Sequence, residues 1–144
     1  MKEIWRDIKN YEGLYQVSNT GKVKSLARTY KNRKCEEIIK SPSLASKGYY
    51  RLPLCKEGKT KYYYIHRLVA EAFIPNPNNY KMVNHKDENK LNNNANNLEW
   101  CTHTYNMNYG NINIKRYLSI VSRYLTKHGR NDIAIKINEI KKEL

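Results

Sequence analysis

The spacing of apolar residues changes near position 110 of this 144-residue chain. Before that point, short runs of alternating apolar and polar residues lie between turn-forming clusters, which is typical of β-hairpins. From Ile112 onward, apolar residues recur every three or four positions, as on one face of a helix. The sequence therefore predicts an α+β fold in which small hairpins precede a helical tail. The length allows one compact unit with small appendages.

The first half of the chain shows two hairpin patterns. The predicted elements are a hairpin of Leu14–Val17 and Val23–Leu26, a hairpin of Tyr49–Cys55 and Lys61–Ile65, and a helix over His66–Phe73. Between Lys31 and Ser46 the alternation weakens, so this stretch is expected to be a loop or a short irregular strand. The second hairpin is rich in tyrosine and basic residues, and its exposed face either lies along a nucleic acid or reflects only the strand preference of tyrosine.

Two helices are expected at the carboxyl end, separated by Gly129–Asp132. Asp132 would lie near the start of the second helix, where a carboxylate suits the free backbone donors. The predicted apolar faces comprise Ile114, Tyr117, Leu118, Val121, Tyr124 and Leu125 on the first helix, and Ile133, Ile137, Ile140 and Leu144 on the second. This helical hairpin is either a tail that docks on a nucleic acid or a lid on the core.

Positive charge is concentrated at the two ends of the chain. The chain has 27 lysine and arginine residues against 13 aspartate and glutamate residues, a formal net charge of +14, which favours a polyanionic partner and nucleic acid first. Residues 1–60 carry 14 basic and 6 acidic side chains and residues 111–144 carry 8 and 3, whereas residues 61–110 carry 5 and 4. The charge pattern indicates phosphate-binding flanks around a central segment with another role.

The three cysteines, Cys35, Cys55 and Cys101, are isolated from one another. They predict neither a disulfide framework nor a zinc–cysteine site, and they fit a reducing, cytoplasmic setting. No apolar run approaches the roughly 20 residues that span a bilayer, and no signal-peptide core follows the first residues. A membrane partner is therefore not expected.

The central segment from Val83 to Asn106 carries the residues suited to chemistry. Its pattern predicts a strand ending at His85, a polar loop, a return strand over Leu98–Cys101, and a helix capped by Thr102. In that arrangement Asn106 lies in the first turns of the helix, so its side chain and His85 can converge.

Phosphodiester hydrolysis needs a base to deprotonate water and a cation to neutralise charge. His85 is the candidate base. The amide oxygens of Asn84 and Asn106 are hard ligands suited to one magnesium or manganese ion. Because neither ligand is charged, metal binding without a phosphate partner is expected to be weak.

Several motifs in this region match a known pattern: Val83-Asn84-His85-Lys86-Asp87, Asn89-Lys90, Asn92-Asn93, Asn97-Leu98-Glu99-Trp100 and Asn106, with His66-Arg67-Leu68-Val69-Ala70 upstream. Together they resemble the ββα-metal motif of the HNH homing endonucleases found in phage and intron-borne genes. The resemblance implies that His85 is the general base, that Asn106 is the metal-binding helix residue, and that Asn97 braces the loop by side-chain hydrogen bonds to backbone.

The chain departs from that family pattern at two positions. Asn84 stands where some related enzymes have aspartate, which keeps an oxygen ligand but removes its charge. The helix offers Asn106, Asn108 and Tyr109 where some relatives have histidine, and Asn106 is the first choice. His66 either orients the site, binds phosphate or serves the fold alone.

The amino-terminal residues resemble the small DNA-binding module often joined to such nucleases, through Trp5-x-Asp7-Ile8 and the stretch from Tyr11-Glu12-Gly13-Leu14-Tyr15 to Val23-x-Ser25. The expected organisation is a DNA-binding module in residues 1–48, a nuclease core in residues 49–110 and a helical tail in residues 111–144. The candidate DNA-binding residues are Lys22, Lys24, Arg28, Arg51, Lys61, Tyr63, Arg67, Lys86, Arg116 and Arg123.

The sequence thus predicts a metal-dependent endonuclease acting on double-stranded DNA. One such site per chain favours a monomer that nicks, whereas cutting both strands requires a dimer or two sequential nicks. A DNA-binding protein whose HNH scaffold has lost cleavage is the alternative, with the uncharged Asn84 in its favour and the retained His85 against it. A third class, an RNA-binding module that stacks bases on its tyrosines, lacks any supporting RNP-like sequence.

Overall fold

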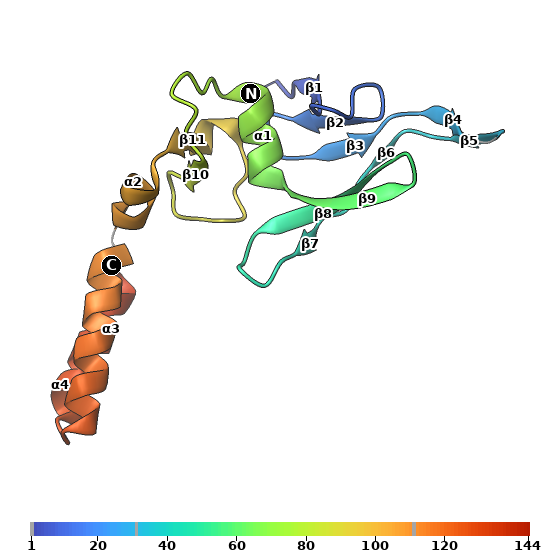
Figure 1. The fold of residues 1–144 in the computed structure, drawn as a ribbon. Coiled ribbons are helices and arrows are strands. Elements are labelled where there is room, and N and C mark those ends of the chain that lie inside the picture. Colours follow the sequence, from blue (N-terminus) through green and yellow to red (C-terminus); the bar gives the residue numbers. More distant parts are fainter. Residues whose placement is uncertain (1, 31, 111) are drawn as a thin grey trace. The chain divides into compact units, whose positions relative to one another are not determined.

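The computed structural model describes residues 2–30, 32–110 and 112–144 (Figure 1). The chain divides into two compact units, Met1–Cys101 and Thr102–Leu144. The first is built of short antiparallel strands with the α-helix α1 (Ile65–Phe73) and a short 3-10 helix, and the second is helical. This mixed architecture confirms the predicted α+β class. Within the described residues, no helix combines the length and the apolar character needed to cross a bilayer.

The first sheet contains the predicted amino-terminal hairpin. Its strands follow the order β1-β2-β3-β6, where β1 is Trp5–Asp7, β2 is Tyr15–Ser18, β3 is Val23–Ser25 and β6 is Ile38–Ile39. In the hairpin of β2 and β3, Tyr15 lies opposite Ser25 and Val17 opposite Val23. Tyr15, Val17 and Val23 are buried, because alternate residues of a strand point to the same face.

The stretch after β3 contains more strand than the sequence indicated. β4 (Arg28–Tyr30) pairs with β5 (Arg33–Cys35), β6 joins the first sheet, and β7 (Ser43–Leu44) pairs with β8 (Tyr50–Lys56). The expected loop or short irregular strand is therefore three short strands, and Lys31 lies outside the described residues. Strands of two or three residues contain too few positions to show a readable alternation.

The second predicted hairpin is formed by β8 (Tyr50–Lys56) and β9 (Lys59–Tyr64). Its turn is shorter than expected, because Lys56 pairs with Lys59 and only two residues remain between the strands. Those residues, Glu57 and Gly58, have φ angles of 53° and 73°, as a two-residue turn with two left-handed positions requires. Helix α1 (Ile65–Phe73) follows directly, so Ile65 begins the helix and does not end the strand.

Helix α1 and the strands share one apolar core. Its fully buried members are Leu52 and Leu54 of β8, Val69 and Ala70 of α1, and Val17 of β2. Val83 and Leu98 join this core from the next hairpin, formed by β10 (Met82–His85) and β11 (Leu98–Cys101). A short 3-10 helix, η1 (Ala95–Asn97), leads into β11. The strand, loop and strand predicted for this segment are confirmed.

The second unit contains α2 (His103–Asn108), α3 (Ile112–Lys127) and α4 (Asn131–Glu143). Thr102 caps α2 as predicted, because its hydroxyl accepts a hydrogen bond from the Tyr105 amide at 3.1 Å. The tail is a helical hairpin, and Asp132 lies in the first turn of α4.

The apolar stripe between α3 and α4 is narrower than the sequence pattern indicated. Ser122 and Ala134 are buried there, and the Ser122 hydroxyl donates to the Ala134 carbonyl across the pair at 3.4 Å. Tyr117 and Tyr124 of the predicted α3 face are 67% and 61% exposed. Two helices in contact bury only the positions that face one another, so the outer part of each apolar stripe stays open.

Candidate active site

His85 is the last residue of β10, opposite the buried Leu98 of β11. The neighbouring Val83 belongs to the apolar core, which fixes the strand in place. The His85 side chain is itself buried, with only 5% of the residue exposed. The sequence-predicted base is therefore held against the core at the point where the strand gives way to the polar loop.

The imidazole of His85 belongs to a cluster of four rings, formed with Tyr49, Tyr64 and His66 and called here the ring cluster. The centroid of His66 lies 5.3 Å from that of His85, and the centroid of Tyr49 lies 5.9 Å from it. Tyr49 also approaches His66 at 4.8 Å, and Tyr64 approaches His66 at 5.6 Å. Edge and tilted contacts of this kind restrict ring rotation, so the cluster holds the two histidines in defined orientations.

Both histidines of the ring cluster are held in their neutral form. Burial lowers the pKa of His85 from its usual value, outweighing the opposing effects of the hydrogen bond that Asn93 accepts and of the Asp87 charge. Burial also lowers the pKa of His66 to about 3, and repulsion from His85, when His85 is protonated, and from Arg67 adds to the effect. The buried Nδ1 of His66 has no hydrogen-bond partner. A neutral His85 has the lone pair that a general base needs.

Asn93 determines which nitrogen of His85 carries that lone pair. The Asn93 side-chain nitrogen donates to the Leu91 carbonyl at 3.1 Å, so its Oδ1 is the atom that faces His85. Oδ1 lies 3.4 Å from Nε2 of His85, and an amide oxygen can only accept, so Nε2 carries the proton and Nδ1 the lone pair. Asn93 is only 5% exposed. Sequence reasoning gave it no role, because nothing distinguishes it from the asparagines on either side.

Short polar side chains hold the loop of residues 86–97 in place. Asn97 accepts from the Asp87 amide at 3.1 Å and donates to the Asp87 carboxylate at 2.8 Å and to the Asn92 carbonyl at 2.9 Å. The Asn92 amide also donates to Asp87, at 2.7 Å. Hydrogen bonds from Asn92 and then Asn97 hold the pKa of Asp87 below its usual value. These contacts are of the kind expected for Asn97, and its part in catalysis stays a prediction.

Asn84, the first predicted metal ligand, lies on β10 directly opposite Glu99 of β11. Its side-chain nitrogen donates to the Glu99 carboxylate at 2.8 Å, which turns the amide oxygen away from that carboxylate. An amide oxygen fixed in this way fits a hard divalent cation such as magnesium or manganese. Among the described residues, no group of three or more His, Cys, Asp or Glu side chains could hold a metal.

Sequence reasoning missed the part that Glu99 plays beside Asn84. Cross-strand pairing would have revealed it, since the two residues are directly opposite in an antiparallel pair. The register depends on how many residues the loop uses to turn, and the sequence alone does not fix that number. Glu99 adds a negative charge next to a ligand that has none.

Asn106, the second predicted ligand, lies in α2 of the second unit. Its backbone amide donates to the Thr102 carbonyl at 3.0 Å, which places it in the first turn of that helix as expected. Asn84 and His85 belong to the first unit. The approach of Asn106 to His85 therefore stays a prediction.

The predicted DNA-binding residues fall into two groups. Arg51, Lys61, Arg116 and Arg123 are exposed, and Arg51 lies over the Tyr62 ring at 4.8 Å. The other six make polar contacts within the chain. Two form ion pairs, Lys22 with Glu3 at 3.3 Å and Lys24 with Glu37 at 3.2 Å, and two form hydrogen bonds to side chains, Arg28 with Ser25 at 2.9 Å and Tyr63 with Tyr11 at 3.3 Å. The last two donate to backbone carbonyls, Arg67 to that of Lys81 at 3.0 Å and Lys86 to that of Asn96 at 3.0 Å. Their role in DNA binding stays a prediction.

Comparison with known protein families finds two matches along the chain. Residues 3–55 match the NUMOD4 motif, and residues 63–108 match the HNH endonuclease family. The second match includes the ring-cluster residues Tyr64, His66 and His85, and the loop between the two strands.

Comparison with individual proteins finds relatives in viruses. An HNH endonuclease of Acanthamoeba polyphaga mimivirus is 41% identical, over 76% of this chain and 30% of its own length. The DNA endonuclease I-HmuI of Bacillus phage SP01 is 38% identical, over 96% of this chain and 76% of its own length. This chain therefore spans less than a third of the mimivirus relative but most of the phage one.

A solved structure gives the same result in three dimensions. The structure described as DNA binding and cleavage by the HNH homing endonuclease I-HmuI matches with a TM-score of 0.58 and 36% identity, over 96% of this chain and 68% of that one. The strand-loop-strand geometry around His85, the two family matches and the phage relative agree with one another. The chain belongs to the HNH homing endonuclease family and has a NUMOD4 motif on its amino-terminal side.

Proposed function

We propose that this chain is a metal-dependent DNA endonuclease that hydrolyses phosphodiester bonds and nicks duplex DNA. The observation that carries the proposal is the state of His85, which is buried, neutral and hydrogen-bonded so that Nδ1 has the lone pair. A buried neutral histidine at the end of a strand is what general-base chemistry requires. The relative I-HmuI is described as a DNA endonuclease, which favours DNA as the substrate.

His85 acts on the attacking water. Its Nδ1 accepts a proton from that water as the oxygen attacks the scissile phosphate, and the hydrogen bond from Nε2 to Asn93 stabilises the positive charge that the ring acquires. The imidazole does not need to turn during the reaction, because the ring cluster holds it. The expected products have 5′-phosphate and 3′-hydroxyl ends, as in other HNH endonucleases.

The amide oxygens of Asn84 and Asn106 are the proposed ligands of one magnesium or manganese ion. A divalent cation bound there supplies charge that stabilises the phosphate and the leaving 3′ oxygen. Asn84 presents its oxygen because Glu99 holds the nitrogen of the same amide. Both proposed ligands are neutral, so the DNA phosphate is expected to complete the metal site.

The net charge of +14 and the exposed basic residues support double-stranded DNA as the partner. The proposed phosphate contacts are the exposed Arg51 of β8, Lys61 of β9, and Arg116 and Arg123 of α3. A monomer with one active site makes single-strand nicks, and a double-strand break needs a second copy or a second event.

One observation favours a second candidate function. The position of the first metal ligand holds the uncharged Asn84, so a DNA-binding protein on an inactive HNH scaffold is the alternative. Glu99 argues against that alternative, because it places a carboxylate 2.8 Å from the Asn84 amide nitrogen and restores negative charge to this part of the molecule. The alternative predicts DNA binding without any cutting.

The test is incubation of the purified chain with supercoiled plasmid in magnesium, in manganese and in chelator, with gel migration as the readout. The nuclease proposal predicts conversion to the nicked form in either metal and none in chelator. Binding of the plasmid without cutting in any metal would reject the enzyme. The Asn84→Asp variant then tests whether the missing ligand charge is the cause of the failure to cut. An inactive scaffold that lacks only this charge should gain metal-dependent cutting.

A further inference from the structure

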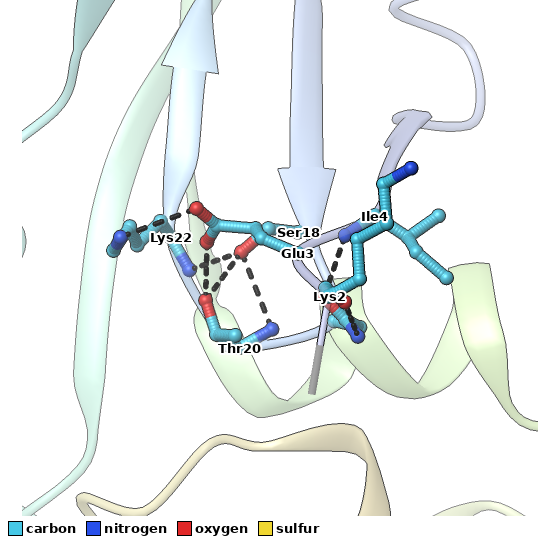
Figure 2. Close-up of polar contacts among 7 residues, drawn as sticks. Lys2, Glu3, Ile4, Ser18, Thr20 and Lys22 are labelled. Carbon is cyan, nitrogen blue, oxygen red and sulfur yellow. Dashed lines mark hydrogen bonds and ion pairs between the residues drawn. The ribbon is translucent and has the colours of Figure 1, made fainter.

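The turn between β2 and β3, residues Ser18–Lys22, is fixed by the amino-terminal segment. Figure 2 shows the Thr20 hydroxyl donating to the Glu3 carboxylate, which also pairs with the Lys22 ammonium at 3.3 Å. The Ser18 hydroxyl accepts from the Lys22 amide at 3.1 Å. Asn19 joins the turn to the start of the chain, because its side-chain oxygen accepts from the Ile4 amide at 2.9 Å. Ser18 and Asn19 are buried, at 0% and 6% exposed.

The turn then contacts the polar loop of the HNH region at two points. The Asn19 carbonyl accepts a hydrogen bond from the Ala95 amide at 2.9 Å, at the first residue of η1. Gly21, with a φ of 92°, packs against Asn93 so closely that a β-carbon at position 21 would lie 2.9 Å from the Asn93 β-carbon and 3.2 Å from its carbonyl oxygen. Only glycine fits this contact, because carbon atoms cannot approach to 2.9 Å without displacement.

Asn93 is the residue that hydrogen-bonds His85. Its Oδ1 is 3.4 Å from Nε2, near the upper limit for a hydrogen bond, so a small displacement of the Asn93 stem removes the contact. The turn therefore contacts the candidate base through one intervening side chain. Sequence order hides this relation, because Gly21 and His85 are 64 positions apart along the chain.

We propose that the Ser18–Lys22 turn of the NUMOD4 region is a positioning element for His85, in which Gly21 acts through Asn93 and Asn19 holds the same loop at Ala95. The turn fixes the place of Asn93, and Asn93 selects the neutral form of His85 that keeps the proton on Nε2. This inference rests on the proposed function in one respect, that His85 is the base of the reaction. It gives the amino-terminal module a role in the geometry of catalysis in addition to any role in DNA binding.

A purely structural role of Gly21 makes a different prediction. Gly13 has a similar left-handed φ of 72°, but a β-carbon there would meet nothing within 4 Å. Alanine at either position imposes a comparable backbone strain, and only alanine at position 21 also pushes on Asn93. Gly13→Ala is therefore the matched control for Gly21→Ala.

The first readout is the nitrogen spectrum of the histidine rings in the metal-free, 15N-histidine-labelled protein at pH 8, where His85 is neutral. The four histidines give four ring patterns, and that of His85 is assigned by its loss in His85→Gln. We expect the native protein and Gly13→Ala to show His85 protonated on Nε2. Gly21→Ala and Asn93→Ala are expected to shift this pattern toward a mixture of both tautomers. Asn93→Asp, which keeps an acceptor oxygen, is expected to retain the native pattern.

The second readout is the cutting rate on duplex DNA. Gly21→Ala and Asn93→Ala are expected to lower kcat on the order of tenfold to a hundredfold with KM nearly unchanged, because a misplaced base affects the chemical step and not DNA binding. A His85 pattern in Gly21→Ala identical to that of Gly13→Ala would overturn the proposal. If Gly21→Ala does not fold, the same spectrum is compared between Asn93→Ala and Asn93→Asp. Identical His85 patterns in these two variants would overturn the proposal, because the turn is proposed to act through the Asn93 acceptor. A native protein that cuts no DNA would reject the proposed function while the spectrum still tests the positioning role.

Discussion

Two neighbouring regions meet at His85 and are stabilised in different ways. In the ring cluster, Tyr49 and His66 pack against the His85 imidazole, Tyr64 packs against His66, and the buried Nδ1 of His66 has no hydrogen-bond partner. In the loop of residues 86–97, by contrast, Asn97 and Asp87 are tied together by several short hydrogen bonds near the surface. Burial in the ring cluster keeps the base neutral and limits its rotation, whereas the loop supplies the Asn93 hydrogen bond that sets its tautomer.

A neutral ring and a defined tautomer, which are two requirements of a general base, are met here by separate physical means. Neutrality comes from burial, which disfavours charge and acts without any particular partner. The tautomer comes from a directional hydrogen bond, which the single amide of Asn93 supplies. The two regions should therefore respond differently to substitution and to acid.

The largest effect is expected where the two regions meet. His85→Ala removes the base, and we expect a loss of cutting rate of at least about 100-fold, since general-base catalysis contributes roughly two to four orders of magnitude. DNA binding should change little, as measured by filter binding in chelator. His128→Ala is the control, because that histidine is exposed near the end of α3. Equal losses in both variants would remove His85 from its proposed role.

The second largest effect is expected from acid, which should destabilise the ring cluster before it affects the loop. The pKa of His66 is about 3 in the folded chain against an ordinary value of 6.5, so between these values the unfolded chain binds a proton that the folded chain does not. Stability contributed by neutral His66 is complete above pH 6.5 and falls by roughly 1.4 kcal/mol per pH unit below it, or about 3 kcal/mol by pH 4. Urea unfolding measured from pH 7.5 to 4 reports this slope.

The loop should not respond to acid in the same window. The pKa of Asp87 is held below its ordinary value of 3.8, so its contribution is lost only at still lower pH. His66→Phe is the matched variant, because it keeps a ring in the cluster and removes the titrating group. We expect this variant to show a flatter slope between pH 6.5 and 4. An unchanged slope would mean that some other group causes the acid sensitivity.

Amino-acid substitution in the loop should lower the free energy of unfolding more than acid acting on the loop does. Asn97→Ala removes three hydrogen bonds made by one side chain, and we expect the free energy of unfolding to fall by about 1–3 kcal/mol. Cutting should slow as well, because the loop no longer holds Asn93 and His85 in register. Asn78→Ala, at an exposed position after α1, is the control and should change stability by less than about 0.5 kcal/mol. Thermal unfolding of both variants checks the difference.

The smallest effect is expected outside both regions, on the exposed side of α3. Neutralising Arg116, Arg123 and Lys127 should weaken binding to all DNA sequences alike and lower the slope of log affinity against log salt by roughly 0.9 for each phosphate that the protein no longer neutralises. Neither the His66 acid slope nor the stability of the loop should change. Lysine at positions 116 and 123 preserves charge and should preserve the slope. A salt slope equal to the native one would exclude α3 from DNA binding.

The fold was predictable from sequence wherever an element was long enough to show a period. The hairpins of β2 with β3 and of β8 with β9, and the helix α1, follow directly from alternation and helical spacing. The strands β5, β6 and β7 were not predictable, because two or three residues show no period. The exposure of Tyr117 and Tyr124 on α3 was also hidden, since an apolar stripe does not say how much of it a neighbour covers.

The candidate site was predictable in its residue types but not in its contacts. His85 and Asn84 were found from motif spacing. Their partners Asn93 and Glu99 were not, because one lies in a run of identical residues and the other depends on strand register. The contact of Gly21 with Asn93 joins residues from two separate motifs, which no local pattern can show.

The central claim, that the neutral imidazole of His85 is the base, is tested most directly by chemical rescue. The cutting rate of His85→Ala on supercoiled plasmid in magnesium would be measured with and without added imidazole, at pH 6 and pH 8. The account predicts a rate far below the native one that rises with imidazole, and more at pH 8, where more imidazole is neutral. A His85→Ala protein that cuts at the native rate without imidazole would contradict the account.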